Sequence, residues 1–272
     1  MILINGLAEN RIDVVDRGLQ YGDGLFETIP YRAGRAEFLD AHFQRLKLGC
    51  ERLQIPFTQF DLLQAELTTA CQQLNDDAVI KVIITRGSGG RGYFSDKQTK
   101  PTRIISTHSY PTYPSSNSQQ GISVRLCRHK LSENPTLAGI KHLNRLDQVL
   151  ARNEWNDDVS EGLMSDQNER IIEGTMSNVF VVKSGMLITP LLRTSGVSGI
   201  IRQQIIRLAT KQNITVKEVD LTRQDLQEAD EVFVCNSVIG IWPVIRITDL
   251  KHSYPVGPVT KQCQNMLLRA DK

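Results

Sequence analysis

The amino-acid sequence predicts an α+β protein made of two α/β-type domains. Its length of 272 residues exceeds that of one typical domain. Helical and strand-like patterns alternate along the chain, and a polar stretch rich in proline and serine interrupts them near residue 115. A hydrophobic content of 40% and a charged content of 23% are ordinary for a globular protein.

The first third of the chain predicts two helices and a pair of strands. Residues 35–39 can form a short strand, and Asp40 is placed to cap a helix over 41–53. A second helix is expected over 60–74. Residues 79–85 form a nearly continuous β-branched run, which is typical of a strand buried on both faces, and residues 103–107 resemble its partner.

Residues 110–121 contain proline, serine and glycine without an apolar period, and they predict a linker. We expect a smaller N-terminal α/β domain over 1–114, the linker itself over 115–121, and a larger C-terminal domain over 122–272 that carries the reactive lysine. The elements expected in the larger domain are strands at 122–127, 162–165, 179–182, 186–189 and 231–234, and helices at 144–153 and 199–212.

Composition argues against several functional classes. A net charge of +2 and the lack of a long basic run do not favour nucleic-acid binding. No apolar stretch approaches the roughly 18 residues of a membrane span. The five scattered cysteines contain no CxxC pair, and the histidines lack HxxxH or HExxH spacing, so neither disulfides nor a metal site is expected. Because the N-terminus does not resemble a signal peptide, a reducing cytoplasm is the expected compartment.

Lys141 is the main candidate nucleophile. It follows a short apolar run, and desolvation makes a lysine amine lose its proton more readily. A neutral amine can form a Schiff base with a carbonyl compound or with pyridoxal phosphate. Taken alone, a solvated lysine beside a buried stretch is the commoner explanation.

Two glycine-containing segments are candidate anion sites. Residues 86–93 follow the predicted buried strand and offer Arg86 and Arg91 for carboxylates, although a hairpin turn fits equally well. Residues 194–202 lead into a helix whose free N–H groups can bind phosphate, although an ordinary capped helix start is commoner. Asn236 and Ser237 follow another strand and offer further donors.

Two charged residues in apolar surroundings are also candidates. Glu173 lies between apolar pairs, where a partly buried carboxylate normally needs a cationic partner, or it is simply a turn residue. Arg45 lies on an otherwise apolar helix face, from which it can extend to solvent or reach a phosphate.

Six segments in the same order give the chain a specific likeness to a known family. Together they resemble the fold-type IV pyridoxal-phosphate enzymes, which share the D-amino-acid aminotransferase-like fold. The segment 137–146 is similar to the aminodeoxychorismate lyases within that group. The six segments are 16–28, 42–46, 86–93, 137–146, 173–180 and 196–202.

The resemblance implies a role for each matching residue. Lys141 would bind pyridoxal phosphate as a Schiff base and then move a proton, and Glu173 would face the pyridine nitrogen and strengthen the ring as an electron sink. Ile201 stands where family members often have threonine, so only its backbone contribution is implied. The implied phosphate ligands are Arg45, the amides of Ile200 and Ile201, and the Ser237 region. Arg91 and Tyr93 match substrate-binding positions, and Thr28 is a proposed proton donor or orienting group.

The implied reaction converts 4-amino-4-deoxychorismate to 4-aminobenzoate and pyruvate, a step of folate biosynthesis. Lys141 would remove the proton from the carbon that bears the amine, and enolpyruvate would leave as the ring becomes aromatic. A D-amino-acid or branched-chain aminotransferase would share Lys141, Glu173 and Arg45 and is the alternative enzyme. A scaffold protein without catalytic activity is a third possibility. The family resemblance also implies a homodimer.

Overall fold

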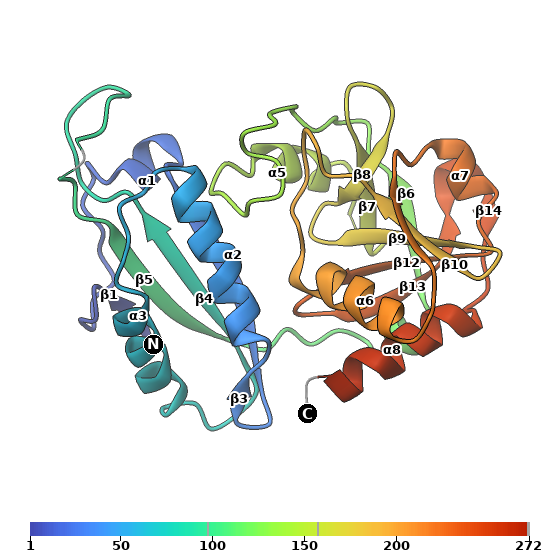
Figure 1. The fold of residues 1–272 in the computed structure, drawn as a ribbon, viewed down its shortest axis with the longest axis horizontal. Helices are drawn as coiled ribbons and strands as arrows, with labels where there is room; N and C mark the ends of the chain where they lie inside the picture. The colour runs from blue at the N-terminus through green and yellow to red at the C-terminus, as the bar shows by residue number, and fades with distance from the viewer. Residues whose placement is uncertain (97, 157, 271–272) are drawn as a thin grey trace. The chain divides into compact units, whose positions relative to one another are not determined.

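The computed structural model describes residues 1–96, 98–156 and 158–270 (Figure 1). The chain forms two compact units, and most of the first consists of Met1–Pro111. The second comprises Thr112–Gly139 and Arg145–Lys272. No helix among the described residues is long and apolar enough to cross a membrane.

The first unit is an antiparallel sheet with helices packed on one face. Its strands follow the hydrogen-bonding order β1-β5-β4-β2-β3. Helix α2 runs along this face of the sheet (Figure 1). The elements are β1 (Ile2–Ile4), α1 (Arg17–Tyr21), β2 (Gly24–Arg32), β3 (Arg35–Ala36), α2 (Leu39–Arg52), α3 (Phe60–Cys71), β4 (Ala78–Thr85) and β5 (Thr102–Ser109).

Alternation along the strands separates a buried face from an open one. Leu25 and Ile29 of β2 are almost fully buried, and Leu25 lies under Gly49 of α2. Successive side chains of a strand point to opposite faces, so Phe26 and Thr28 lie on the other face, where they are half-buried. The predicted strand β4 is confirmed, but its expected burial on both faces is wrong, because Lys81 and Ile83 remain half-exposed there.

The start of α2 differs from the expected capping. The helix begins at Leu39, and its N-cap is Phe38 in a left-handed conformation with φ of 48°. Asp40 therefore lies inside the first turn, where a carboxylate still interacts favourably with the helix dipole. The strand expected over 35–39 shortens to Arg35–Ala36, and the helix expected over 60–74 ends at Cys71.

Residues Ile140–Asn144 belong to the first unit, although the sequence places Lys141 in the C-terminal domain. The backbone N–H of Phe26 donates to the carbonyl of Lys141 at 3.0 Å, and the N–H of Leu143 donates to Gly24 at 3.0 Å. These long-range hydrogen bonds add the segment to the edge of β2. The helix expected from residue 144 therefore begins only at Leu146.

The second unit is built on a larger mixed sheet in the order β11-β10-β9-β12-β13-β6-β7-β8, with β14 paired to β13. A short helix, α4, lies inside the expected linker. The elements are α4 (Ser116–Gln119), β6 (Ile122–Leu126), α5 (Leu146–Arg152), β7 (Glu161–Ser165), β8 (Ile171–Gly174), β9 (Asn178–Lys183), β10 (Met186–Pro190), α6 (Ile200–Lys211), β11 (Val216–Val219), α7 (Arg223–Gln227), β12 (Glu231–Asn236), β13 (Gly240–Ile247), η1 (Thr248–Leu250), β14 (His252–Ser253) and α8 (Pro258–Ala270).

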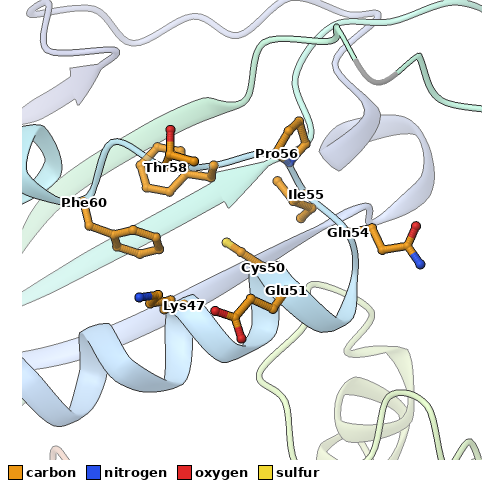
Figure 2. A pocket seen from close by; sticks show the side chains of 9 residues that line it. Lys47, Cys50, Glu51, Gln54, Ile55, Pro56, Thr58 and Phe60 are labelled. Atoms are coloured by element: carbon orange, nitrogen blue, oxygen red, sulfur yellow. The ribbon is translucent and has the colours of Figure 1, made fainter.

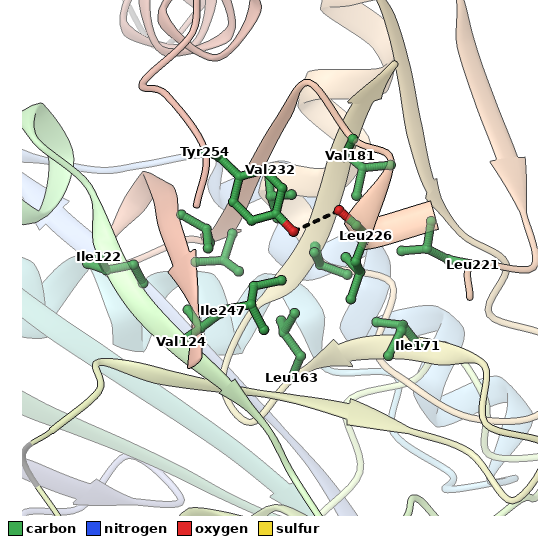
Figure 3. Close-up of a cluster of buried hydrophobic side chains, with 14 of the residues drawn as sticks. Ile122, Val124, Leu163, Ile171, Val181, Leu221, Leu226, Val232, Ile247 and Tyr254 are labelled. Carbon is green, nitrogen blue, oxygen red and sulfur yellow. Dashed lines mark hydrogen bonds between the residues drawn. The ribbon is translucent and has the colours of Figure 1, made fainter. Parts of the chain in front are cut away.

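The connection between β8 and β9 shows that this sheet is strongly curved. Only residues 175–177 join the two strands, and such a connection spans at most about 15 Å. In the sheet order β9 lies five strands from β8, which would be about 24 Å across a flat sheet. The sheet must therefore curl so that β8 and β9 come into contact. The apolar core inside it includes Val124, Leu163 and Val232 (Figure 3).

Gly24 is required where β2 is closely flanked on both sides. A Cβ at this position would lie 2.6 Å from the carbonyl oxygen of Ile84 and 2.8 Å from Leu143. We expect Gly24→Ala to lower the free energy of unfolding by about 1–3 kcal/mol, because the backbone must move to admit the methyl group. Gly90→Ala is the control, since that position is open, and it should change stability by less than about 0.5 kcal/mol. Urea denaturation measures both, and equal values would contradict the packing argument.

Candidate active site

Lys141 lies on the open face of the sheet in the first unit. Its segment pairs with β2 so that Leu25 opposes His142, which sets Lys141 beside Phe26. The Lys141 Nζ lies 4.3 Å from the centroid of the Phe26 ring. An ammonium group at this distance is attracted to the ring face, so the aromatic ring positions the amine and partly removes it from water.

Behind this strand, a buried carboxylate joins two residues of α2. Glu27 is 1% exposed and accepts a hydrogen bond from Arg45 Nε at 2.8 Å. An Arg45 Nη also donates to Glu27, and His42 Nδ1 lies 2.6 Å from the same carboxylate. The spacing of His42 and Arg45 by three residues puts both on the helix face that covers β2.

The charges in this cluster are strongly coupled. Burial by itself raises the pKa of Glu27, but the charge of Arg45 and the hydrogen bonds from Arg45 and His42 lower that pKa to about 2. Burial lowers the pKa of His42 despite its bond to Glu27, and the charges of Arg45 and Lys141 lower it further. The cluster is therefore an ionised Glu27–Arg45 pair beside a neutral imidazole.

Sequence reasoning proposed Arg45 as a phosphate ligand but gave Glu27 and His42 no role. A signal for Glu27 was present, because Leu25, Glu27 and Ile29 alternate in a strand and share its core face. A charged residue at such a position needs a buried partner. The missing step was recognition of β2 itself, which the sequence analysis did not predict as a strand.

The glycine-rich segment 86–93 is anchored by ion pairs at its base. The Arg86 guanidinium bonds the Asp23 carboxylate, with Nε at 2.7 Å, and also donates to the carbonyls of Leu53 and Gln54. Arg86 is therefore a structural residue and not the carboxylate ligand that the sequence suggested.

The tip of the same loop is exposed. The Arg17 guanidinium donates to the carbonyls of Gly92 at 2.9 Å and Tyr93 at 3.0 Å. These bonds hold the loop backbone and leave the side chain of Tyr93 89% exposed. Arg91 is exposed as well. Both predicted substrate residues are thus accessible to a ligand.

A pocket of about 470 Å³ lies at the C-terminal end of α2 (Figure 2). It contains none of the residues expected in the active site. Burial raises the pKa of Cys50, which lines it, to about 12, so this thiol is a poor nucleophile at neutral pH. The other lining residues are Lys47, Glu51, Gln54, Ile55, Pro56, Phe57, Thr58 and Phe60.

In the second unit, Glu173 lies near the end of β8 and is 3% exposed. Its carboxylate accepts the backbone N–H of Val197 at 2.8 Å and the side-chain amide of Gln148 at 3.3 Å. Val197 belongs to the loop that leads into α6, so this hydrogen bond ties the carboxylate to the loop. Gln148 was not identified from the sequence.

The start of α6 has the properties of an anion site. Gly199 is its N-cap and provides no side-chain hydrogen bond, and the first turn contains no acidic residue. The N–H groups of Ile200 and Ile201 have no acceptor among the residues that the structure describes. Free N–H groups at a helix N-terminus favour a bound phosphate. The side chains of both isoleucines are buried, so only their backbones are available.

The loop before α6 is held from two sides. Asn178 Nδ2 donates to the carbonyl of Val197 at 2.8 Å. The N–H of Gly139 donates to Gly196 at 2.8 Å, and the N–H of Ser198 donates to Gly139 at 3.0 Å. The backbone of Gly139, just before Ile140, is therefore hydrogen-bonded to the same loop whose Val197 N–H donates to Glu173.

The turn after Glu173 surrounds a second buried carboxylate, Glu161. Its oxygens accept the N–H and hydroxyl of Thr175 at 3.1 and 2.6 Å and the Ser177 hydroxyl at 2.7 Å. They also accept the N–H of Gly162 at 2.8 Å and of Met176 at 3.3 Å. No lysine, arginine or histidine of the described chain forms an ion pair with Glu161. Neutral donors alone stabilise this anion, and they fix the shape of the turn.

Ser237 lies just after β12, in a turn that Asn236 organises. Asn236 Oδ1 accepts the N–H groups of Val238 and Ile239 at 2.8 and 2.9 Å. Its Nδ2 donates to the carbonyl of Met176 at 2.9 Å. The turn that contains Ser237 is thereby bonded to the turn that follows Glu173.

Comparison with known proteins identifies the family. The family model for amino-transferase class IV matches residues 24–247. This chain belongs to the class IV aminotransferase family. It is 35% identical over 270 residues to an aminodeoxychorismate lyase of Vibrio harveyi, covering 98% of this chain and 99% of that protein. The matched residues 24–247 include every position assigned to the cofactor from the sequence.

Two solved structures of high similarity carry different names. The crystal structure of 4-amino-4-deoxychorismate lyase from Pseudomonas aeruginosa is 44% identical with a TM-score of 0.95, covering 100% of this chain and 99% of that one. The branched-chain amino acid aminotransferase of Escherichia coli is 28% identical with a TM-score of 0.89, covering 100% and 94%. The fold-type IV architecture expected from the sequence is thus confirmed for this class IV aminotransferase family member.

Removing the Glu27 charge tests the buried cluster. The folded pKa of about 2 lies below the ordinary 4.5, so Glu27 contributes stability above pH 4.5, and the contribution is lost as the pH falls towards 2. We expect Glu27→Gln to lower the free energy of unfolding at neutral pH by roughly 3 kcal/mol. The difference from the wild type should shrink as the pH falls below 4.5.

Urea denaturation over a pH series measures this effect. Glu37→Gln is the matched control, because it breaks an ion pair with Arg32 that is more exposed to solvent. That change should cost less than about 1 kcal/mol. A similar loss in both variants, or a loss for Glu27→Gln that does not depend on pH, would contradict the strong coupling of Glu27 to Arg45.

Proposed function

We propose that this chain is a pyridoxal-phosphate-dependent aminodeoxychorismate lyase, which converts 4-amino-4-deoxychorismate to 4-aminobenzoate and pyruvate in folate biosynthesis. The supporting observation is Lys141, whose amine lies against Phe26 on the open sheet face of a chain that matches a lyase structure along its whole length. The lyase match is stronger than the aminotransferase match in both identity and TM-score.

The residues of each unit fit pyridoxal phosphate. We assign the covalent attachment to Lys141 and the phosphate to Arg45, to the N–H groups of Ile200 and Ile201, and to the Ser237 turn. The start of α6 supports this assignment, because its N–H groups lack acceptors in the described chain and no acidic side chain opposes an anion there. Ile201 contributes no hydroxyl. When bound, the cofactor supplies an electron sink for the carbon that bears the substrate amine.

We assign Glu173 to the pyridine nitrogen. A carboxylate fixed by hydrogen bonds from Val197 and Gln148 can hold a proton on that nitrogen without rotating away. Glu27 in turn positions Arg45, since it binds the guanidinium through Nε and an Nη. Glu27 therefore acts on another residue of the protein, whereas Glu173 is assigned to the cofactor itself.

Lys141 performs the proton transfer in this proposal. Its amine takes the proton from the ring carbon that bears the nitrogen, and the electron pair of that C–H bond expels the neighbouring enolpyruvyl oxygen. The ring becomes aromatic, and the released enolpyruvate gains a proton on carbon to become pyruvate. Thr28 follows Phe26 on the same sheet face and is assigned as a proton donor or orienting group. Arg91 and Tyr93, which are exposed on their loop, are assigned to the substrate.

A product assay distinguishes the lyase from the alternative aminotransferase. We expect the purified protein loaded with pyridoxal phosphate to form 4-aminobenzoate, detected by fluorescence, from aminodeoxychorismate. Lys141→Ala should lose the visible absorbance of the attached cofactor and reduce turnover by more than about 10³-fold, because it removes both the attachment point and the base. Transfer of an amino group from D- or branched-chain amino acids to a keto acid, without 4-aminobenzoate, would identify an aminotransferase instead.

We also propose that the enzyme is a cytoplasmic homodimer. Helix α5 exposes three large apolar side chains spaced three and four residues apart, Leu146, Val149 and Leu150. An apolar stripe with this spacing is suited to packing against another protein surface, here a second copy of the chain. All five cysteines are free, which is the usual state of thiols in a reducing compartment.

A charge placed in the α5 stripe tests the dimer. We expect the wild type to sediment as a dimer and Val149→Asp to shift it towards monomer by at least about tenfold in the dissociation constant, because a buried carboxylate would lack a partner. Leu268→Asp is the control, since it alters a single exposed leucine on α8. A monomeric wild type, or equal effects of both substitutions in analytical ultracentrifugation, would rule out this interface.

A further inference from the structure

Lys81 is a lysine in the middle of a sheet, on the same face as Lys141. It lies in β4, directly opposite Thr28 of β2 and Ser106 of β5. Opposite residues in antiparallel strands point to the same face. The Thr28 hydroxyl and the Lys81 amine therefore form one polar row, next to the row that contains Phe26.

The amines of Lys81 and Lys141 share one aromatic neighbour. The Lys81 Nζ lies 5.4 Å from the centroid of the Phe26 ring, and the Lys141 Nζ lies 4.3 Å from the same centroid. Both side chains are half-buried. The structure thus places a second cationic group close to the proposed catalytic amine.

Lys81 is a half-buried cation without an acidic partner among the described residues. Arg17 pairs with Asp23, and Arg103 pairs with Glu66. Lys81 forms no ion pair or hydrogen bond with any residue that the structure describes. A half-buried ammonium group without a counter-ion keeps its three N–H donors available to an anion that binds on this face.

Packing alone does not require a lysine here. A cation–π contact at a partly exposed position stabilises a protein only slightly, and an apolar side chain would pack against Phe26 at least as well. The neighbours of Lys81 along β4 are apolar, namely Val79, Ile80, Val82 and Ile83. The ammonium group is therefore the feature that needs an explanation.

The substrate of the proposed reaction carries carboxylates that Lys81 can bind. The two products, 4-aminobenzoate and pyruvate, each carry one carboxylate, so the substrate carries two in addition to the reacting amine. An α-amino acid with an apolar side chain carries only one carboxylate. The proposed lyase substrate therefore gives this face a second carboxylate to bind, which an apolar amino acid does not.

We propose that Lys81 binds a carboxylate of the substrate and is a specificity-determining residue of the lyase, an inference that rests on the proposed function. Its ammonium group has three N–H donors, and the Thr28 hydroxyl opposite can donate a further hydrogen bond to the same group. The pair holds the substrate on the open sheet face while the amine at the other end of the ring reaches Lys141.

The test replaces Lys81 and compares binding with turnover. Lys81→Met should raise the KM for aminodeoxychorismate by about 10- to 100-fold, because a charge-assisted hydrogen bond is lost. The visible absorbance of the attached cofactor and the pyridoxal-phosphate affinity should stay unchanged. Lys81→Arg should recover much of the loss, since it keeps the charge. Lys47→Met removes an exposed lysine from the same unit and should leave KM unchanged.

Product inhibition identifies which carboxylate is bound. 4-Aminobenzoate retains the ring carboxylate, and pyruvate retains the carboxylate of the side chain. Weaker inhibition of Lys81→Met by either compound, relative to the wild type, supports the proposal. The compound whose inhibition weakens identifies the carboxylate that Lys81 binds. The binding of both can also be followed through the cofactor absorbance, which does not depend on turnover.

Three results would overturn the proposal. The first is an unchanged KM together with a shifted pH dependence of the cofactor absorbance, which would mean that Lys81 acts only on the charge of Lys141. The second is an equal rise in KM for Lys47→Met, which would indicate a general charge effect. The third is unchanged inhibition by both products. Failure of the wild type to form 4-aminobenzoate would instead refute the lyase assignment.

Discussion

The connection between β8 and β9 is only three residues long, and the second unit is arranged around that limit. The sheet must curl to bring the two strands together, and the turn that completes the curl surrounds the carboxylate of Glu161. Glu173 lies two residues before this turn, and Asn178 immediately follows it. Asn178 then holds the loop that donates to Glu173, so the same closure organises the acid and the start of α6.

Buried carboxylates are stabilised in two different ways in this protein. Glu27 is paired with a buried arginine, and its pKa falls to about 2 because the charge of Arg45 and the hydrogen bonds from Arg45 and His42 together outweigh burial. Among the described residues, Glu161 and Glu231 accept hydrogen bonds only from neutral N–H and O–H donors. The donors to Glu231 are Val259 and Thr260 at the start of α8. A paired charge suits a residue that positions another charged group, whereas neutral donors suit a carboxylate that shapes the backbone.

The open face of the sheet in the first unit combines the features that the proposed reaction needs. Phe26 positions two amines, of which Lys141 is assigned to the proton transfer and Lys81 to a substrate carboxylate. Helices on the opposite face supply the rigid support, because α2 fixes β2 from behind through Glu27. The fold is shared with aminotransferases, so the difference in chemistry comes from the side chains of the site and not from the architecture.

The sequence by itself determined the strongly periodic elements and singled out Lys141 as the candidate nucleophile. Strand β4 and helix α6 could be predicted because their hydrophobic patterns involve only residues close together in the sequence. Lys141 was likewise chosen from the residues that flank it. Tertiary structure decided the extended pairing of Ile140–Asn144 with β2, the loss of Asp40 as a cap and the use of Arg86 as an anchor. It also decided the partners of Glu27 and Glu161. The start of α2 follows from the left-handed backbone of Phe38. The other features depend on hydrogen bonds between residues that are distant in the chain, and a local sequence pattern does not identify such partners.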